Sequence, residues 1–215
     1  MAKRPRVLLA DDHTLVLEGL RRLLEGRCEL VGMVEDGRAL VELAPKVAPD
    51  LILLDISMPL LNGLEAARQL RRLVPESRVI FLTMHADPTY ASEAFEAGAA
   101  GYLLKRSAAS ELAVAIATVL DGRKYLTPLI PGETLRASVP RSVPVPPTLG
   151  KLTPRQREVL QLVAEGHTAK EVAASLGISV KTVEFHKASL MDRLGVRTAS
   201  ELTKYAVAHG LTELP

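Results

Sequence analysis

Short apolar runs alternate with longer amphipathic stretches over the first 120 residues. The runs are rich in Val, Ile and Leu, which is typical of strands buried on both faces of a parallel sheet. They occupy residues 6–10, 30–34, 51–54, 78–84 and 101–105. The stretches between and after them repeat apolar residues three and four positions apart, as one face of a helix requires. These predicted helices cover residues 15–24, 38–47, 64–73, 90–97 and 111–120.

This five-fold alternation predicts a doubly wound α/β domain. Strands separated by helices pair in parallel through right-handed crossovers, which cover both faces of the sheet. We therefore expect a five-stranded parallel sheet of the flavodoxin-like kind. The pattern ends near Gly122, and we place this domain at residues 1–124.

A proline-rich segment follows the α/β pattern. Helical periodicity stops, and the segment ends in the run PRSVPVPP at residues 140–147. Proline lacks an amide donor and fixes φ, so an extended spacer is expected. We assign residues 125–149 to a linker between domains. A ligand of the Pro-x-x-Pro kind is the functional alternative.

The last 66 residues, 150–215, carry the start and stop signals of short helices. Thr153 before Pro154 predicts one helix start, and Thr168 and Ser179 predict two more. Gly177 ends the second helix immediately before the third begins. Two helices joined by a tight turn containing glycine are typical of a helix-turn-helix domain. The expected helices after the first are residues 169–176, 180–194 and 199–209.

The helix at residues 180–194 has an unusual outer face. If Val183, Leu190 and Leu194 face the core, the helical angle leaves an exposed Phe185 beside an exposed Glu184. A solvated face rarely carries that pair, whereas phenylalanine can touch a thymine methyl and glutamate can accept from cytosine. A small helical bundle with polar outer faces is the simpler alternative. Lys181 and Ala188 lie on the same outer face.

Composition narrows the classes of protein without choosing among them. The formal net charge is +2, and residues 151–215 contain nine basic and seven acidic residues, so charge alone does not indicate nucleic acid. The single cysteine, Cys28, excludes an internal disulfide and a cysteine-based zinc cluster. Without an apolar run of membrane-spanning length or a signal-peptide segment, we expect a cytoplasmic protein without a membrane partner.

Polar residues follow the predicted strands where each strand ends. Carboxyl ends of parallel strands meet at one edge of the sheet, so these side chains are expected to converge there. Three clustered carboxylates repel one another unless a cation lies among them, and oxygen ligands suit Mg²⁺. The residues concerned are Asp11, Asp12, Asp55, Thr83 and Lys105.

Each of these residues has a simpler explanation when taken singly. Asp11 or Asp12 could cap the following helix, Thr83 could be an ordinary strand residue, and Lys105 a solvated strand end. Four separate strand ends would then carry oxygen ligands or a compensating cation by coincidence. The joint pattern favours a site.

The first domain resembles the receiver domain of two-component response regulators. The match extends over residues 6–120 and rests on an ordered set of residues. This set is Asp11-Asp12, Asp55 followed by Met58-Pro59 and Gly63, then Thr83, Tyr102 and Lys105. The resemblance implies that Asp55 is the phosphoacceptor and that Mg²⁺ is held by Asp12, Asp55 and the Ser57 backbone carbonyl, with Asp11 acting through water.

The same resemblance implies a switch. Thr83 and Tyr102 would respond to phosphorylation, with Thr83 drawn inward and Tyr102 entering the vacated space, while Lys105 contacts the phosphoryl group. A sensor histidine kinase would be the phosphoryl donor.

The second domain resembles the LuxR-type DNA-binding domain, and the whole chain resembles the NarL/FixJ class of response regulators. The resemblance is carried by LTPRQREVL, ISVKTVEFH and RLGV. It implies that Glu184, Phe185 and Ala188 face base edges, that the helix at residues 199–209 mediates dimerisation, and that a homodimer binds two promoter half-sites on double-stranded DNA. Residues placed near DNA phosphates are Lys181, Thr182 and Lys187.

The sequence therefore predicts a phosphorylation-controlled transcription factor rather than an enzyme. A phosphatase with an aspartyl nucleophile would carry a second Asp two residues further on, where this chain has Ser57. The remaining alternative is a DNA-binding regulator whose receiver takes no phosphate and serves only for dimerisation or ligand sensing.

Overall fold

The N-terminal domain is a parallel α/β sandwich, as the alternation predicts. The computed structural model of the chain describes residues 4–130 and 152–212. The strands are β1 (Arg6–Ala10), β2 (Glu29–Val34), β3 (Leu51–Leu54), β4 (Arg78–Thr83), β5 (Gly101–Leu104) and β6 (Tyr125–Leu126). The helices are α1 (Thr14–Leu24), α2 (Gly37–Val47), α3 (Gly63–Leu73), α4 (Pro88–Glu96) and α5 (Ala108–Leu120), with a 3-10 turn, η1 (Lys105–Ser107), before α5.

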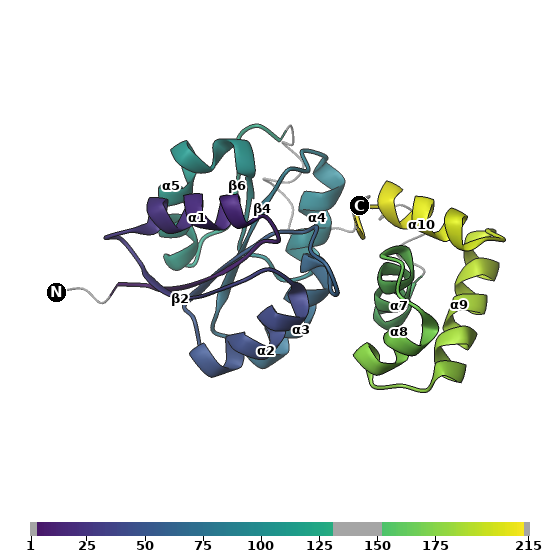
Figure 1. Cartoon of the computed structure of the whole chain (residues 1–215). Coiled ribbons are helices and arrows are strands. Elements are labelled where there is room, and N and C mark those ends of the chain that lie inside the picture. The colour runs from purple at the N-terminus through teal and green to yellow at the C-terminus, as the bar shows by residue number, and fades with distance from the viewer. Residues whose placement is uncertain (1–3, 131–151, 213–215) are drawn as a thin grey trace.

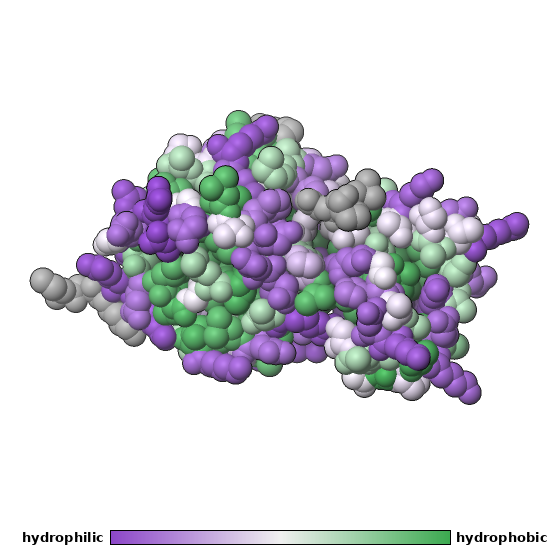
Figure 2. Space-filling view, viewed as in Figure 1, coloured by the Kyte–Doolittle hydropathy of each residue, from purple (hydrophilic) through white to green (hydrophobic). Residues whose placement is uncertain are grey.

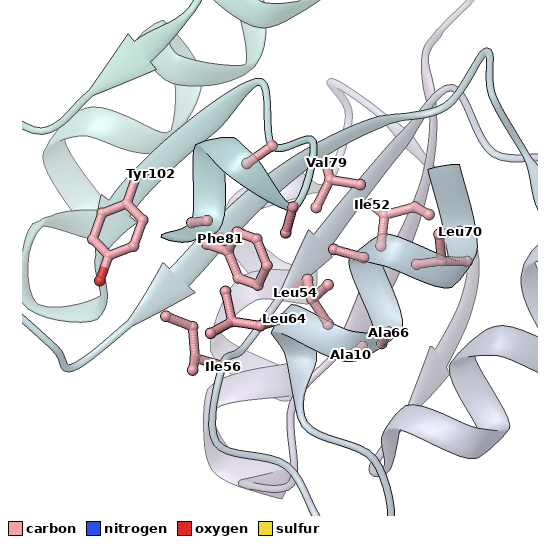
Figure 3. Packing of buried hydrophobic residues seen from close by; sticks show 14 of the residues in the cluster. Ala10, Ile52, Leu54, Ile56, Leu64, Ala66, Leu70, Val79, Phe81 and Tyr102 are labelled. Carbon is pink, nitrogen blue, oxygen red and sulfur yellow. The ribbon is translucent and has the colours of Figure 1, made fainter. Parts of the chain in front are cut away.

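All strand pairs are parallel, in the order β2-β1-β3-β4-β5-β6. Helices α1 and α5 cover one face of the sheet, and α2, α3 and α4 cover the other (Figure 1). Every residue of β3 is buried, which explains its continuous apolar run. On the second face, Leu54, Leu64 and Phe81 gather between the sheet and α3 (Figure 3).

The sheet has one strand more than the five expected. Residues 125–130, which the sequence assigned to the linker, pack on the N-terminal domain. Glu111 on α5 accepts hydrogen bonds from the Tyr125 hydroxyl at 2.8 Å and the Thr127 hydroxyl at 2.9 Å, and Ile130 is buried. Two residues are too few for a periodic signal in the sequence. Backbone pairing with β5 and these side-chain contacts hold the strand in place. The proline-rich run at residues 140–147 lies outside the described residues.

The C-terminal domain is a small helical bundle with a helix-turn-helix. Its helices are α7 (Pro154–Ala164), α8 (Ala169–Leu176), α9 (Val180–Leu194) and α10 (Ala199–Ala208). The predicted caps are confirmed: Thr153 forms a capping box with Gln156, Thr168 forms one with Glu171, and Ser179 caps α9. Gly177 ends α8 with φ of 63°, a conformation that glycine adopts without strain.

The C-terminal domain packs against the N-terminal domain through α7, while α9 lies on the outer side (Figure 1). Its core comes from all four helices and includes Val159, Val172, Val183 and Leu202. Among the described residues, no helix is both long and apolar enough to cross a membrane.

Gly63 is required where α3 begins. A Cβ added there would lie 1.9 Å from the backbone oxygen of Asp55, so Gly63→Ala should lower the free energy of unfolding by about 3 kcal/mol or more. Gly19→Ala is the matched control, because its Cβ meets nothing within 4 Å on α1 and should stabilise the helix by about 1 kcal/mol. Urea unfolding of both variants measures the difference, and equal effects would contradict the close contact.

Candidate functional site

Asp55, Asp11 and Lys105 form an ion cluster at the carboxyl edge of the sheet. Asp55 directly follows β3, and β1 and β3 are neighbours where the strand order changes direction, the usual ligand site of such sheets. The Lys105 ammonium lies 2.7 Å from Asp55 Oδ2 and 2.8 Å from Asp11 Oδ2. Asp55 Oδ1 accepts from the backbone N–H of Ile56 at 2.7 Å. The predicted convergence of these strand ends is therefore observed.

Asp12 completes an acidic pocket with Asp11 and Asp55. One ligand atom from each of these residues and from His13 lies within 4.8 Å of the others. Neither aspartate caps α1: His13 occupies the N-cap position, and Asp11 Oδ1 accepts the His13 N–H at 2.9 Å. The carboxylates therefore do not serve as helix caps, and the cluster of hard oxygen atoms is consistent with metal binding.

Burial disfavours the ionised form of these acids. It raises the pKa of Asp55 to about 6, although the neighbouring Lys105 acts in the opposite direction. Burial also raises the pKa of Asp12. For Lys105, burial lowers the pKa, but the Asp55 charge and the hydrogen bonds to both acids raise it by more. Because burial makes ionisation of Asp55 unfavourable, a cation bound next to it would stabilise the ionised carboxylate.

His85 connects the remaining predicted residues. Its Nε2 lies 3.1 Å from the Ser57 hydroxyl, and its backbone N–H donates to Thr83 Oγ1 at 3.2 Å. The Tyr102 hydroxyl donates to the His85 carbonyl at 2.9 Å. Tyr102 is fully buried, so it already occupies an inward position in this conformation. Burial raises the pKa of the Tyr102 phenol strongly.

Sequence reasoning missed two residues of this edge. Neither His13 nor His85 was among the site residues predicted from the sequence. His13 is exposed, and its Nδ1 lies 3.2 Å from Asp11 and 3.0 Å from Asp12. The His85 ring is partly buried and stacks on Tyr90 at 4.3 Å between centroids. Each histidine follows closely on the end of a strand, and that was the available signal.

Comparison with known proteins agrees with this geometry. A family model described as "Response regulator receiver domain" matches residues 7–117, and one described as "Bacterial regulatory proteins, luxR family" matches residues 150–206. The chain belongs to the response regulators. It has a receiver domain followed by a LuxR-type helix-turn-helix domain, in a family of transcriptional regulators rather than enzymes.

Full-length relatives share the whole architecture. The transcriptional regulatory protein MctR of Rhizobium johnstonii is 36% identical over 215 residues, covering 98% of each chain. RcsB of Salmonella enterica serovar Typhimurium, solved bound to promoter rprA with the phosphomimetic BeF3⁻, is 32% identical with a TM-score of 0.62, covering 94% of this chain and 98% of that one. A structure of two RcsB dimers bound to two parallel DNAs is 31% identical with a TM-score of 0.58, covering 96% of this chain and 99% of that one.

The LuxR-type domain leaves the predicted reading face of α9 open. Phe185 is 69% exposed, and Glu184, Lys181 and Ala188 are exposed beside it. Thr182 and Lys187 are partly exposed. Val183 and Leu190 are buried on the opposite side, and Leu194 packs partly against the same core. Hydrophilic residues protrude from the outer edge of this domain (Figure 2).

The burial of Asp55 predicts a pH-dependent gain in stability for Asp55→Asn. Folding raises the pKa of Asp55 from 3.8 to about 6. The contribution of protonated Asp55 to the free energy of unfolding is therefore complete below pH 3.8 and is lost as the pH rises through 6. Asparagine stays neutral, so without metal it should raise the free energy of unfolding by about 2 to 3 kcal/mol at pH 7.5 and by little at pH 4.

Denaturant unfolding in chelator at both pH values measures this gain. Asp192→Asn, at an exposed position on α9, is the control and should change stability by less than about 0.5 kcal/mol at either pH. A gain for Asp55→Asn that is equal at pH 4 and pH 7.5 would contradict the assignment.

Proposed function

We propose that Asp55 is the phosphoacceptor of this regulator and that Asp12, Asp55 and the Ser57 backbone carbonyl hold Mg²⁺, with Asp11 contributing through water. The observation that carries this proposal is the buried Asp55 carboxylate at the sheet edge, paired with Lys105 and adjacent to Asp11. When bound, Mg²⁺ would neutralise charge on the phosphoryl oxygens during transfer. The oxygen-only character of the three aspartates fits this ion better than a softer metal.

The chain's own residues would position the transfer. An Asp55 carboxylate oxygen attacks the phosphorus of a phosphohistidine on a sensor kinase, the P–N bond breaks, and an acyl phosphate remains on Asp55. Lys105 would exchange its contact with the Asp55 carboxylate for one with the phosphoryl group. The same geometry would accept a small phosphoryl donor.

Thr83 and Tyr102 would change their hydrogen bonds in response to the phosphoryl group. The Thr83 hydroxyl accepts from the His85 N–H in this conformation, and turning it toward a phosphoryl oxygen would release that N–H. Since the Tyr102 hydroxyl donates to the same residue's carbonyl, the two side chains act on one backbone segment. Phosphorylation would thereby shift the population of conformations around α4 and β5 that exist beforehand.

Helix α9 would enter the major groove of promoter DNA. Its exposed Glu184, Phe185 and Ala188 are placed to meet base edges, and Lys181, Thr182 and Lys187 to meet phosphates. The modest positive charge of one domain supports binding as a homodimer on two half-sites, through α10. The structure of two RcsB dimers bound to two parallel DNAs supports this assembly. A protein that reads promoters and receives its signal from a kinase would act in the cytoplasm.

Incubation with acetyl phosphate and Mg²⁺ should add one phosphoryl group to Asp55. Asp55→Asn should abolish labelling, because the remaining acids of the pocket, Asp11 and Asp12, follow β1 and do not occupy the phosphoacceptor position after β3. Asp12→Ala should also lose labelling while keeping the fold, since Asp12 lies at the rim rather than in the core. Intact-mass measurement and peptide mapping test both variants.

Asp121→Asn, at an exposed position after α5, is the control and should label normally. Labelling that survives Asp55→Asn, or that proceeds equally with Mg²⁺ chelated, would favour the alternative of a regulator independent of phosphate.

Two substitutions on α9 should separate backbone contacts from base contacts. Lys187→Ala should weaken binding to every sequence and reduce the salt dependence of binding by about one unit of slope. Glu184→Ala should cost about 1 to 3 kcal/mol at the preferred site only. Binding isotherms on specific and scrambled duplexes at several salt concentrations measure both effects.

Lys46→Ala removes an exposed charge from the receiver and should leave the slope unchanged. If Glu184→Ala lowers the affinity for the specific and scrambled duplexes equally, Glu184 does not contact the bases.

A further inference from the structure

A polar face of α7 is buried against the receiver. Arg157 pairs with Glu65 of α3 at 2.5 Å, and Glu158 pairs with Arg38 of α2 at 3.2 Å. Gln161, one turn further along the same face, is fully buried. The recognition helix α9 stays exposed in this docked arrangement, so the contact does not cover the DNA-reading face.

Gln161 binds the loop that follows Asp55. Its Oε1 accepts from the backbone N–H of Asn62 at 2.8 Å and from the Asn62 amide at 3.2 Å. Its Nε2 donates to the Met58 carbonyl at 2.8 Å. Glu165 accepts from the Leu60 N–H at 3.2 Å and from Gln161 Nε2 at 2.7 Å. Two side chains of the DNA-binding domain thus satisfy backbone groups of a receiver loop.

This loop is closed on itself at the phosphoacceptor. The Gly63 N–H donates to the Ile56 carbonyl at 2.8 Å, and Gly63 packs directly on the Asp55 backbone oxygen. Between these ends, Leu60 adopts a φ of 64°, which costs a residue with a Cβ on the order of 1 kcal/mol. The Leu60 side chain packs against the core of the DNA-binding domain. The Leu61 N–H closes a tight turn around Leu60 by donating to the Pro59 carbonyl at 2.7 Å, and the contact with the DNA-binding domain adds to this local constraint.

We propose that Gln161 of the DNA-binding domain is a positioning residue for the chemistry at Asp55. By holding the Met58 carbonyl and the Asn62 N–H, it fixes the loop on both sides, and Ser57 lies between Asp55 and Met58 within that fixed loop. The inference rests on the proposed function in one respect: the Ser57 carbonyl is the ligand that the loop presents to Mg²⁺.

Preorganisation gives the direction of the effect. A loop that is already ordered loses little conformational freedom when a metal binds, whereas a released loop must be ordered at that moment. Releasing Gln161 should therefore weaken Mg²⁺ binding without removing any ligand. By linkage, metal bound at the receiver should tighten docking of the DNA-binding domain by the same factor.

Gln161→Ala in the full-length protein tests this proposal. Exchange of the Leu60 and Asn62 amide protons with solvent should accelerate, because their acceptors are lost or loosened. The dissociation constant for Mg²⁺ alone, measured by NMR titration, should rise by about three- to tenfold, less than the loss typical of a partner that contacts a metal ligand directly.

Gln156→Ala is the matched control. Gln156 lies on the same helix and is buried. Within the described residues, its side chain bonds to the Thr153 N–H and the Ser189 hydroxyl, both in the DNA-binding domain, and to no receiver residue. It should leave both the loop amides and the Mg²⁺ dissociation constant unchanged. An equal effect of the two substitutions would overturn the proposal, because destabilisation of the domain would then explain both.

A second variant separates the loss of hydrogen bonds from the loss of side-chain packing at position 161. Gln161→Glu keeps the size of the side chain but places a carboxylate against Glu165 and the Met58 carbonyl, so it should weaken Mg²⁺ binding at least as much as alanine. Adding Glu165→Gln restores a donor and acceptor pair between positions 161 and 165 and should recover part of the affinity. Absence of recovery would count against the hydrogen-bonded arrangement.

The outcomes separate this proposal from the phosphoacceptor assignment. Faster amide exchange with an unchanged Mg²⁺ dissociation constant would show a docking contact that positions nothing, and would overturn the inference. Normal labelling of Asp55 in that case would leave the proposed function intact. A raised Mg²⁺ dissociation constant for Gln161→Ala, in a protein that takes no phosphoryl group on Asp55, would support the positioning role of Gln161. It would contradict the assignment of Asp55 as the phosphoacceptor.

Discussion

The site depends on keeping three charges together where water is scarce. Asp55 is held at the end of a fully buried strand, and its ionised form is tolerated because Lys105 contacts both it and Asp11. A ligand that binds Asp55 Oδ2 would displace Lys105 from it, because the ammonium lies 2.7 Å from that oxygen atom. The parallel sheet and the loop between Asp55 and Gly63 hold Asp55, Asp11 and Lys105 at one edge of the domain.

Much of the fold follows from residue patterns because its strands and helices are strongly periodic. The continuous apolar run of β3 and the caps at Thr153, Thr168 and Ser179 gave the elements and their order. Strand β6 was not predicted, because two residues show no periodicity and the strand forms through backbone pairing with β5 and contacts with Glu111, both distant in sequence. Local sequence patterns do not reveal such contacts.

The site was only partly accessible from the sequence. Strand ends that carry Asp11, Asp55 and Lys105 meet by topology, so their convergence was predictable. His85 was not, because its importance comes from bonds to Ser57, Thr83 and Tyr102 that require the folded loop geometry. The polar face of α7 was equally hidden, since charged residues on a short helix are expected to face water rather than another domain.

The short strand β6 also has a mechanical consequence. The Thr127 N–H donates to the Tyr102 carbonyl at 2.9 Å, and Ile130 is buried in the same core cluster as Tyr102. The last described residues of the receiver are therefore bound to the strand that carries Tyr102 and not only to α5. A displacement of β5 would carry residues 125–130 with it.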